Sequence, residues 1–292
     1  MKAVARHTGV VTQLGTQHHS SAGCQQAIRW LHDGILGPVS RVVTWTNRPT
    51  WPQGISRPRR GGRVPASLAW DLWLGPASER RYHQAYHPIL WRGWWDFGSG
   101  ALGDMGPHLL DPVVAGLELG GPERVESTSG PVNRWTYPEW STVSWNFRRA
   151  RGQDSPLTLH WSDGSKKPAV EIESAGPLPS NGVMVIGTRG RMFIPDYGGL
   201  PRLLGDLSGE PKPKDLPPSS NHWQQWIEAC QLGRGASCDF DFAARLNEIC
   251  LLGNISIRTG HSINWDNDAG RILNDPLANQ LLGRDRRPGW EV

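Results

Sequence analysis

Apolar residues recur with a helical period in four stretches of the chain. Within residues 24–31 they stand at positions i, i+3, i+4 and i+7, which predicts an amphipathic helix. A second helix is predicted over residues 101–119, with Pro107 tolerated only near its first turns. The apolar positions of residues 223–230 and 242–257 predict two more helices. Helices are therefore expected towards both ends of the chain and once in its middle.

Strand-like segments lie between these helices. β-Branched residues predict a strand over residues 39–46, and a β-rich run also occupies residues 10–15. Further strands are expected at residues 123–129, 140–148, 156–162, 182–188 and 191–195. Consecutive strands joined by turns and flanked by helices favour an α+β fold, a largely antiparallel open β-sheet with helices on one face. This order differs from the alternating β-α-β-α order of a doubly wound nucleotide-binding domain.

The composition narrows the class of protein. The 292 residues are 37% hydrophobic and 20% charged, and the mean hydropathy of -0.48 is typical of a soluble globular chain. No apolar run approaches the ~18–20 residues that a membrane helix needs, and no secretory apolar core follows the first charged residues. The sequence therefore predicts neither a membrane protein nor a precursor with a signal peptide.

Charge and cysteine usage restrict the partners further. The net charge is +4, but the basic residues are spread along the chain without a recognisable nucleic-acid motif, so we expect no nucleic-acid partner. The four cysteines show neither CxxC spacing nor a histidine-paired zinc pattern. Cys24 and Cys230 fall on predicted apolar helix faces, where cysteine acts as a small hydrophobe. Reduced thiols and a cytoplasmic location are the expectation.

A glycine-rich segment precedes the central helix. Residues 98–103, with the sequence GSGALG, fit the GxGxxG pattern of dinucleotide-binding loops. That fingerprint needs a hydrophobic strand before it and a βαβ unit after it, and the pattern predicts neither. The carboxylate of Asp104, expected in the first helical turn, would also repel a pyrophosphate there. We therefore interpret the segment as a glycine-rich helix entry whose backbone approaches a ligand closely.

Three polar residues on the central helix form a candidate catalytic group. Asp104, His108 and Asp111 are spaced i, i+4 and i+7, which places them on one helix face. An imidazole between two carboxylates has its tautomer fixed and its basicity raised, as a general base or acid requires. The alternative is a capping aspartate on a satisfied polar face. A metal would need a third ligand, which has no persuasive spacing here, so no metal site is expected.

Residues 98–111 resemble the glycine-rich DxGxHxxD signature of the glucose-fructose oxidoreductase / inositol dehydrogenase family, written Gfo/Idh/MocA. Other segments are similar to one bacterial branch of that family, in the same order along nearly the whole chain. They are residues 12–17 (TQLGTQ), 45–49 (WTNRP), 51–54 (WPQG), 70–76 (WDLWLGP), 91–98 (WRGWWDFG) and 251–254 (LLGN).

The resemblance implies a two-domain oxidoreductase. An N-terminal Rossmann domain would bind NAD or NADP, and a C-terminal sheet domain would supply the substrate site and the oligomer interface. The implied reaction is hydride transfer between the nicotinamide and a secondary alcohol of a sugar or cyclitol. His108 would accept the proton of the substrate hydroxyl, and Asp104 would orient His108 or bind a neighbouring hydroxyl. Thr16 and Gln17 would lie on the nicotinamide side of the site.

The resemblance also implies a set of substrate contacts. They are Gln17, His19, Arg92, Trp95 and Asp111. The indole of Trp95 would stack on a sugar face, and the guanidinium of Arg92 would donate hydrogen bonds to it. For Trp95, packing in the core or at a subunit interface is the alternative.

The chain departs from the family pattern at its start. Neither an N-terminal GxGxxG nor the Glu-Lys-Pro segment, whose lysine assists proton transfer, precedes the matched segments. We therefore expect residues 1–20 to be a remnant of the Rossmann domain and residues 21–292 to be the substrate and oligomerisation domain. Hydride transfer needs the nicotinamide held close to the substrate carbon, so this chain alone is expected to be inactive or nearly so.

Two alternative functions stay open. One is a cofactor-free module that binds a carbohydrate or associates with itself. The other is a metal-assisted hydrolase that uses Asp104, His108 and a nearby histidine such as His87. A homo-oligomer is expected in any case, because an open antiparallel sheet leaves a broad face to be covered.

Overall fold

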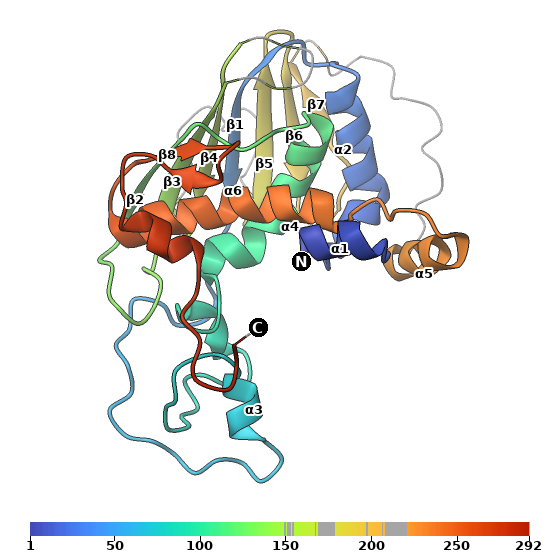
Figure 1. Ribbon diagram of the computed structural model, residues 1–292. Helices are drawn as coiled ribbons and strands as arrows, with labels where there is room; N and C mark the ends of the chain where they lie inside the picture. Colours follow the sequence, from blue (N-terminus) through green and yellow to red (C-terminus); the bar gives the residue numbers. More distant parts are fainter. Residues whose placement is uncertain are drawn as a thin grey trace.

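The computed structural model describes residues 1–148, 150, 153, 155–166, 168, 179–196, 198–205, 207 and 221–291. The helices are α1 (Lys2–Thr8), α2 (Ala22–His32), α3 (Trp70–Leu74), α4 (Gly100–Gly116), α5 (His222–Leu232) and α6 (Phe240–Thr259) (Figure 1). Short 3-10 turns occupy η1 (Gln17–Ser20), η2 (Leu90–Gly93) and η5 (Ala278–Leu282). The strands are β1 (Val39–Trp45), β2 (Arg124–Ser129), β3 (Ser141–Phe147), β4 (Leu157–Ser162), β5 (Gly182–Gly187), β6 (Arg191–Pro195), β7 (Arg202–Leu204), β8 (Ile263–Asp266) and β9 (Arg271–Ile272).

The strands of the described chain form one open sheet in the order β7-β6-β5-β1-β4-β3-β2-β8-β9. Strands β1 and β4 run parallel, and the other neighbouring strands pair antiparallel. Helices α2, α4 and α6 lie across one face of this sheet (Figure 1). The predicted fold class, a largely antiparallel open sheet with helices on one face, is therefore confirmed.

The core fills the space between the sheet and these helices. Burial alternates along β3, where Val143, Trp145 and Phe147 are buried and the residues between them are half-buried. This period of two places one strand face against the helices. The indole of Trp145 is fully buried, and its N–H donates to the carbonyl of Ile249 on α6 over 2.8 Å. The strand and the helix are thus joined by a hydrogen bond inside the apolar layer.

The outer sheet face is polar along β3 and β4. Ser144 Oγ and His160 Nδ1 lie 2.9 Å apart, and Thr158 Oγ1 donates to Asn146 Oδ1 over 3.2 Å. Such cross-strand pairs satisfy polar groups on a face that water can reach. A small apolar cluster on β1, β5 and β6 is buried separately from the main core: Val43, Trp45, Met184 and Phe193. Part of the outer face is therefore apolar and part is polar, and the expected homo-oligomer through this face stays a prediction.

The segment over residues 10–15 is not the strand that its β-rich composition predicts. The backbone N–H of Leu14 donates to the carbonyl of Cys238 over 2.8 Å, and Thr12 Oγ1 accepts from the backbone N–H of Phe240 over 3.0 Å. These bonds hold the segment to the start of α6 in place of a sheet partner. Strands β7, β8 and β9, near the two ends of the sheet, were not predicted, because runs of two to four residues are too short to show alternation.

Helix ends follow the side chains available to cap them. Ser21 Oγ accepts from the backbone N–H of Cys24 over 3.2 Å and caps α2. Helix α4 begins at Gly100 and continues through Pro107 and Pro112, so Pro107 lies inside the helix rather than in its first turns. Gly260, with a φ of 68°, ends α6 as predicted.

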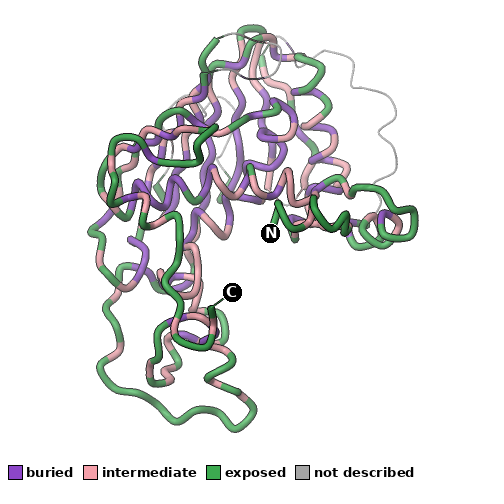
Figure 2. The backbone as a smooth tube through the Cα atoms, in the orientation of Figure 1, coloured by how far each residue is buried: buried purple, intermediate pink, exposed green. Residues whose placement is uncertain are grey.

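Helix α5 extends from the edge of the molecule, and its tube is largely exposed (Figure 2). Cys24 is buried as predicted, but Cys230 is exposed, so its assignment to a buried apolar face is wrong. Trp223 and Trp226 on the same helix are 58% and 44% exposed. The periodic pattern predicts which face of α5 is apolar. Whether that face is buried depends on the position of the helix, and α5 lies at the edge of the molecule.

Residues 47–98 form a lobe below the sheet that carries α3, here called the α3 lobe (Figure 1). Stacked aromatic rings fill it, with Trp70 and Trp73 4.8 Å apart and Tyr86 packed edge-on to Trp94 at 4.7 Å. The end of the chain joins this lobe through Arg287, which donates to the carbonyl of Gly75 over 2.6 Å. Across the described ranges, each helix is too short or too polar to cross a membrane.

Candidate active site

A cavity of about 280 Å³ opens where the start of α4 meets η2 and the segment before η1. It is called here the His108 pocket. Gly15 and Thr16 border one side, Arg92 borders another, and Asp104 and His108 project from α4. The pocket therefore gathers residues from four separate parts of the sequence, since Asn247 of α6 also borders it.

His108 is half-buried in this pocket. Its Nδ1 atom is inaccessible to solvent and has no hydrogen-bond partner among the described residues. The ring lies edge-on to His18, with 5.9 Å between the centroids. Burial, and then the neighbouring His18, lower the pKa of His108 below its ordinary value of 6.5. The nearby carboxylates, Asp104 first, act in the opposite direction but do not outweigh burial. The imidazole is thus kept neutral and able to accept a proton.

Asp104 pairs with Arg92 across the pocket wall. Arg92 Nε donates to Asp104 Oδ1 over 3.0 Å, and the two side chains are 32% and 29% exposed. The guanidinium also lies 4.6 Å from the ring of Trp91. These contacts fix both groups while leaving part of each open to the pocket. The wall therefore offers a carboxylate acceptor beside a guanidinium donor.

Asp111 and His19 form a buried pair behind the pocket. His19 Nδ1 donates to Asp111 Oδ1 over 2.7 Å, and the side chains are 5% and 1% exposed. The expectation that His19 and Asp111 contact substrate is therefore corrected, because protein covers both. The interpretation of His108 as an imidazole held between two carboxylates is corrected as well: Asp104 binds Arg92, and Asp111 binds His19.

The other predicted site residues divide into two groups. Thr16 borders the pocket, and its Oγ1 lies 3.1 Å from the thiol of Cys238. Gln17 is exposed at the start of η1 and does not border the pocket. Trp95 does not border it either. The Trp95 indole N–H donates to the carbonyl of Asn133 over 3.0 Å, and its ring lies 3.6 Å from that of Tyr137. The packing alternative therefore describes Trp95.

Three site residues escaped the sequence reasoning: His18, Trp91 and Asn247. His18 and His19 are consecutive histidines after Gln17, and this pair could have indicated that His18 also belongs to the site. Trp91 precedes Arg92 in a segment already singled out, while Asn247 is a polar residue on a largely apolar helix. All three are brought to His108 by the packing of η1, η2 and α6 around α4.

The glycines of residues 98–103 are used for contacts within the protein. A Cβ on Gly98 would lie 2.4 Å from the carbonyl oxygen of Arg92, and one on Gly100 would lie 2.6 Å from the ring of Tyr137. The interpretation as a helix entry is confirmed, with α4 beginning at Gly100. Gly98 and Gly100 approach protein groups closely, while Gly100 and Gly103 also border the His108 pocket, so the expectation that this backbone lies near a ligand stays a prediction. Asp104 lies in the second helical turn and not in the first.

The structure does not bring together the residues expected for a metal-assisted hydrolase, and a different group of potential ligands lies close together instead. His87 packs edge-on to Trp73 in the α3 lobe, at 5.9 Å, and Asp104 is paired with Arg92. One ligand atom each of His19, Cys24 and Asp111 lie within 4.8 Å of one another, all buried. Burial raises the pKa of the Cys24 thiol well above its usual value, so the thiol stays protonated there. This arrangement gives no support to a hydrolase built on Asp104, His108 and His87.

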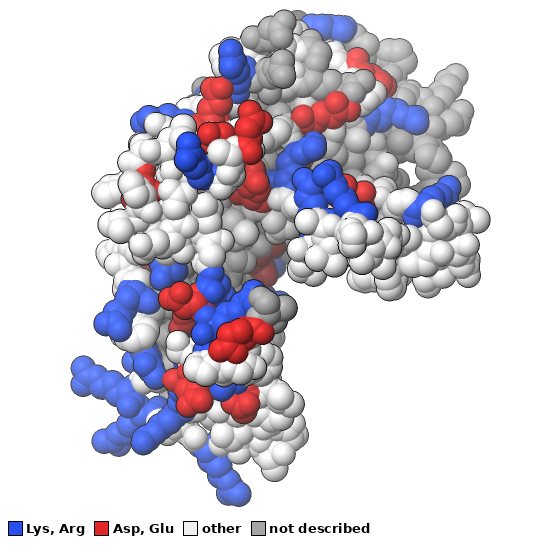
Figure 3. Space-filling model, viewed as in Figure 1, with Lys and Arg blue, Asp and Glu red and all other residues white. Residues whose placement is uncertain are grey.

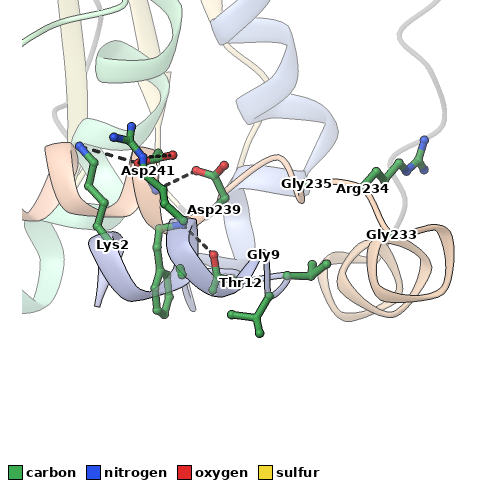
Figure 4. A pocket seen from close by; sticks show the side chains of 13 residues that line it. Lys2, Gly9, Thr12, Gly233, Arg234, Gly235, Asp239 and Asp241 are labelled. Atoms are coloured by element: carbon green, nitrogen blue, oxygen red, sulfur yellow. Dashed lines mark hydrogen bonds and ion pairs between the residues drawn. The ribbon is translucent and has the colours of Figure 1, made fainter.

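A second pocket, of about 190 Å³, lies between α1 and the start of α6 (Figure 4). Asp241 is paired there with Lys2 at 3.7 Å and with Arg6 at 2.8 Å. Asp239 accepts hydrogen bonds from the backbone N–H groups of Asp241 and Phe242 and so caps α6. Lys2, Arg6 and Asp241 are therefore engaged in holding α1 to α6, which indicates a structural role for these three residues.

Comparisons with known proteins agree with this architecture. Residues 32–148 match the family model described as the oxidoreductase family, C-terminal alpha/beta domain. Aldose-aldose oxidoreductase from Caulobacter crescentus, complexed with glycerol, is 17% identical, with 90% of this chain and 66% of that chain covered and a TM-score of 0.54. The WlbA dehydrogenase from Bordetella pertussis, in complex with NADH and UDP-GlcNAcA, is 15% identical, with 91% and 67% covered and a TM-score of 0.56.

A putative NADPH-dependent oxidoreductase from Desulfitobacterium hafniense is 14% identical, with 90% and 67% covered and a TM-score of 0.56. The chain thus spans about two thirds of the length of these structures. The search among curated proteins gives no match. At these identities the solved structures show a shared fold.

The fold and the matched segment define the class: an oxidoreductase-type C-terminal α/β domain. Residues 32–148 match a C-terminal domain model of an oxidoreductase family, in agreement with the resemblance to the Gfo/Idh/MocA oxidoreductases carried by residues 98–111, and the solved structures share the fold.

Proposed function

We propose that this chain supplies the substrate side of an NAD(P)-dependent oxidoreductase acting on a secondary alcohol of a sugar or cyclitol. The observation that carries the proposal is the imidazole of His108, whose Nδ1 has no hydrogen-bond partner among the described residues and whose lowered pKa favours the neutral form, in a pocket beside the Asp104–Arg92 pair. The names of the similar structures support it, since they include an aldose-aldose oxidoreductase and a dehydrogenase bound to NADH and a sugar nucleotide.

In this proposal each pocket residue has a defined task. Asp104 accepts a hydrogen bond from one substrate hydroxyl, and Arg92 donates to the oxygen of another. His108 takes the proton of the hydroxyl that becomes a carbonyl, while the hydrogen on the same carbon leaves as hydride. A bound nicotinamide would supply the hydride acceptor. Oriented binding of this kind holds the reacting hydroxyl against His108.

The cofactor is the part of the proposal that the pocket fits least. Gly98 and Gly100 are closed off by Arg92 and Tyr137, so the glycine segment does not fit a pyrophosphate. Residues 14–16 border the pocket and fit only the nicotinamide side. We therefore propose that this chain alone does not hold the dinucleotide in place for hydride transfer. Self-association through the partly apolar outer sheet face stays a prediction.

The first test is polyol binding. A thermal-shift titration with myo-inositol, glucose and glycerol is expected to raise the melting temperature, because a ligand that binds only the folded state stabilises it. Asp104→Asn should weaken this binding about tenfold, since hydrogen bonds to a charged group contribute about 1.5–3 kcal/mol. Asp268→Asn removes the same charge from an exposed position and serves as the matched control. Mixtures with NAD⁺ or NADP⁺ should give no nicotinamide reduction.

Two outcomes would contradict the proposal. If Asp104→Asn and Asp268→Asn bind the polyol with equal affinity, the polyol does not bind in the His108 pocket. Sustained nicotinamide reduction by the 292-residue chain would show that the dinucleotide is held productively, and the interpretation of the glycine segment would then be withdrawn.

The protonation of His108 gives a second test. Its pKa lies below 6.5, so the neutral base persists as the pH falls towards that value and is lost only below it. An NMR titration of the ring should therefore give a midpoint under 6.5. His18→Gln removes one of the two causes and should raise the midpoint without restoring it fully, because burial is the larger cause. His7→Gln, at an exposed position on α1, should leave the midpoint unchanged, and a midpoint at or above 6.5 in the native chain contradicts the expected effect of burial on His108.

A further inference from the structure

The α3 lobe holds a pocket of its own, of about 440 Å³, that shares no lining residue with the His108 pocket. Two stretches of the lobe form it, residues 57–61 and residues 79–86. Its guanidinium groups come from Arg57, Arg59, Arg60, Arg80 and Arg81. Figure 3 shows basic side chains projecting from this lower part of the molecule. The composition of the pocket wall calls for a ligand of the opposite charge.

The described residues neutralise only part of the charge on this wall, where Arg80 is paired with Asp96. Glu79 is the acidic residue among the lining side chains, and it is 83% exposed and lies 3.6 Å from Arg287. Five arginines thus line the pocket, and among the described residues Asp96, on Arg80, and the outward Glu79 are the carboxylates near them. Like charges in a concave surface reinforce one another and concentrate anions from solution. The arrangement costs stability when empty and gains it when an anion binds.

Arg80 supplies the observation that points to a ligand. Its side chain is only 4% exposed, and its Nη2 forms an ion pair with Asp96. The guanidinium also lies 4.8 Å from the ring of Phe97, which fixes its plane. The Nη1 atom is buried and has no hydrogen-bond partner in the described part of the chain. A buried donor without an acceptor costs about 1–3 kcal/mol, so an acceptor at this position would be stabilising.

The two stretches that carry the arginines are held in register. The backbone N–H of Gly62 donates to the carbonyl of Tyr82 over 2.7 Å. Gly61 approaches Arg81 so closely that a Cβ there would lie 2.6 Å from the Arg81 Cβ. His83 Nδ1 accepts from the backbone N–H of Ala85 over 3.0 Å, which leaves its other ring nitrogen as a donor beside the pocket. The donors are therefore positioned by the backbone.

We propose that this pocket binds a small molecule through a phosphate monoester group. A phosphate monoester carries close to two charges and three acceptor oxygens, which several guanidinium forks can share. A carboxylate has one charge and two oxygens and would leave most of these donors unused. The cavity of about 440 Å³ lies in the range that accommodates small organic ligands. A sugar phosphate and a nucleoside monophosphate share this chemistry.

The test is calorimetric titration of the native chain at constant low ionic strength. The probes are inorganic phosphate, glucose 6-phosphate and AMP, with glucose as the uncharged control. Binding of the phosphate probes is expected, and the double variant R59Q/R81Q should weaken it about tenfold or more, because charge-assisted hydrogen bonds are lost. R234Q/R271Q removes the same charge from exposed positions elsewhere and should change the affinity less than twofold. Arg80 itself is left intact because its burial makes it a structural residue.

Each outcome has a definite meaning. Glucose 6-phosphate binding more tightly than AMP, or the reverse, supports the site and identifies which of the two sources it prefers. An affinity lowered equally by R234Q/R271Q, or no binding of any phosphate probe, overturns the proposal. Tighter binding of a single-stranded oligonucleotide that inorganic phosphate does not displace also overturns it in favour of nucleic acid. Phosphate binding should persist in Asp104→Asn. A negative result for polyol binding in the His108 pocket would therefore not affect the test of the phosphate site.

Discussion

His19→Ala is expected to lower the free energy of unfolding by about 1–3 kcal/mol or more, the range for leaving a buried hydrogen-bond acceptor without its donor. The imidazole of His19 donates to Asp111 over 2.7 Å, and both side chains are almost wholly buried. Without it the Asp111 carboxylate stays inside the protein with no compensating donor. The bond also joins η1 to α4 and so fixes the segment from which Thr16 and His18 reach the His108 pocket.

Urea denaturation of the native chain and the variant measures this difference. The matched control is His32→Ala, which breaks an exposed His32–Asp33 pair of 3.5 Å whose side chains are 46% and 61% exposed. That change should cost under about 1 kcal/mol, as exposed pairs do. The double variant His19→Ala/Asp111→Ala should lose clearly less than the sum of the two single losses, because the pair is coupled. A loss in His19→Ala no larger than in the control contradicts the structural role of the pair.

The sheet and its covering helices could be predicted because their signals are local. Alternation along β3 and the i, i+3, i+4, i+7 spacing of α2 are set by side chains within one element. The segment at residues 10–15 fails for the opposite reason: its β-branched residues favour a strand, but hydrogen bonds to Cys238 and Phe240 determine its backbone. Such bonds join residues more than two hundred positions apart and leave no mark in local composition.

The candidate site divides in the same way. Asp104 and His108 could be found from helical spacing and from the resemblance, and both border the pocket. The partner of Asp111 could not, because His19 lies 92 positions away and competes with His108 for the same carboxylate. The arginine pocket was also hidden, since proline and arginine in residues 47–66 indicate only a surface loop. Pairing across the fold determines which polar residues are left open to a ligand.

Gly98→Ala is expected to destabilise the protein by about 1–3 kcal/mol, the cost of forcing extra atoms into a packed site. The added Cβ would lie 2.4 Å from the carbonyl oxygen of Arg92 and 2.6 Å from its Cα. The backbone of Gly98 cannot move away from Arg92 without breaking hydrogen bonds. The Gly98 backbone N–H donates to the carbonyl of Trp94 over 2.8 Å, and its own carbonyl accepts from the hydroxyl of Tyr137 over 3.2 Å.

The same substitution separates two interpretations of the GSGALG segment. If Gly98 is a packing residue, Gly98→Ala displaces the backbone of Arg92, and thermal unfolding and polyol affinity fall together. Gly120→Ala is the matched control, because nothing lies within 4 Å of a Cβ there, and its effect should stay within about 0.5 kcal/mol, as for an ordinary surface change. If the glycine instead served to admit a phosphate, the variant would unfold at the native temperature. An unchanged melting temperature for Gly98→Ala would therefore contradict the packing role, and a polyol affinity that falls without a change in melting temperature would indicate a ligand beside Gly98.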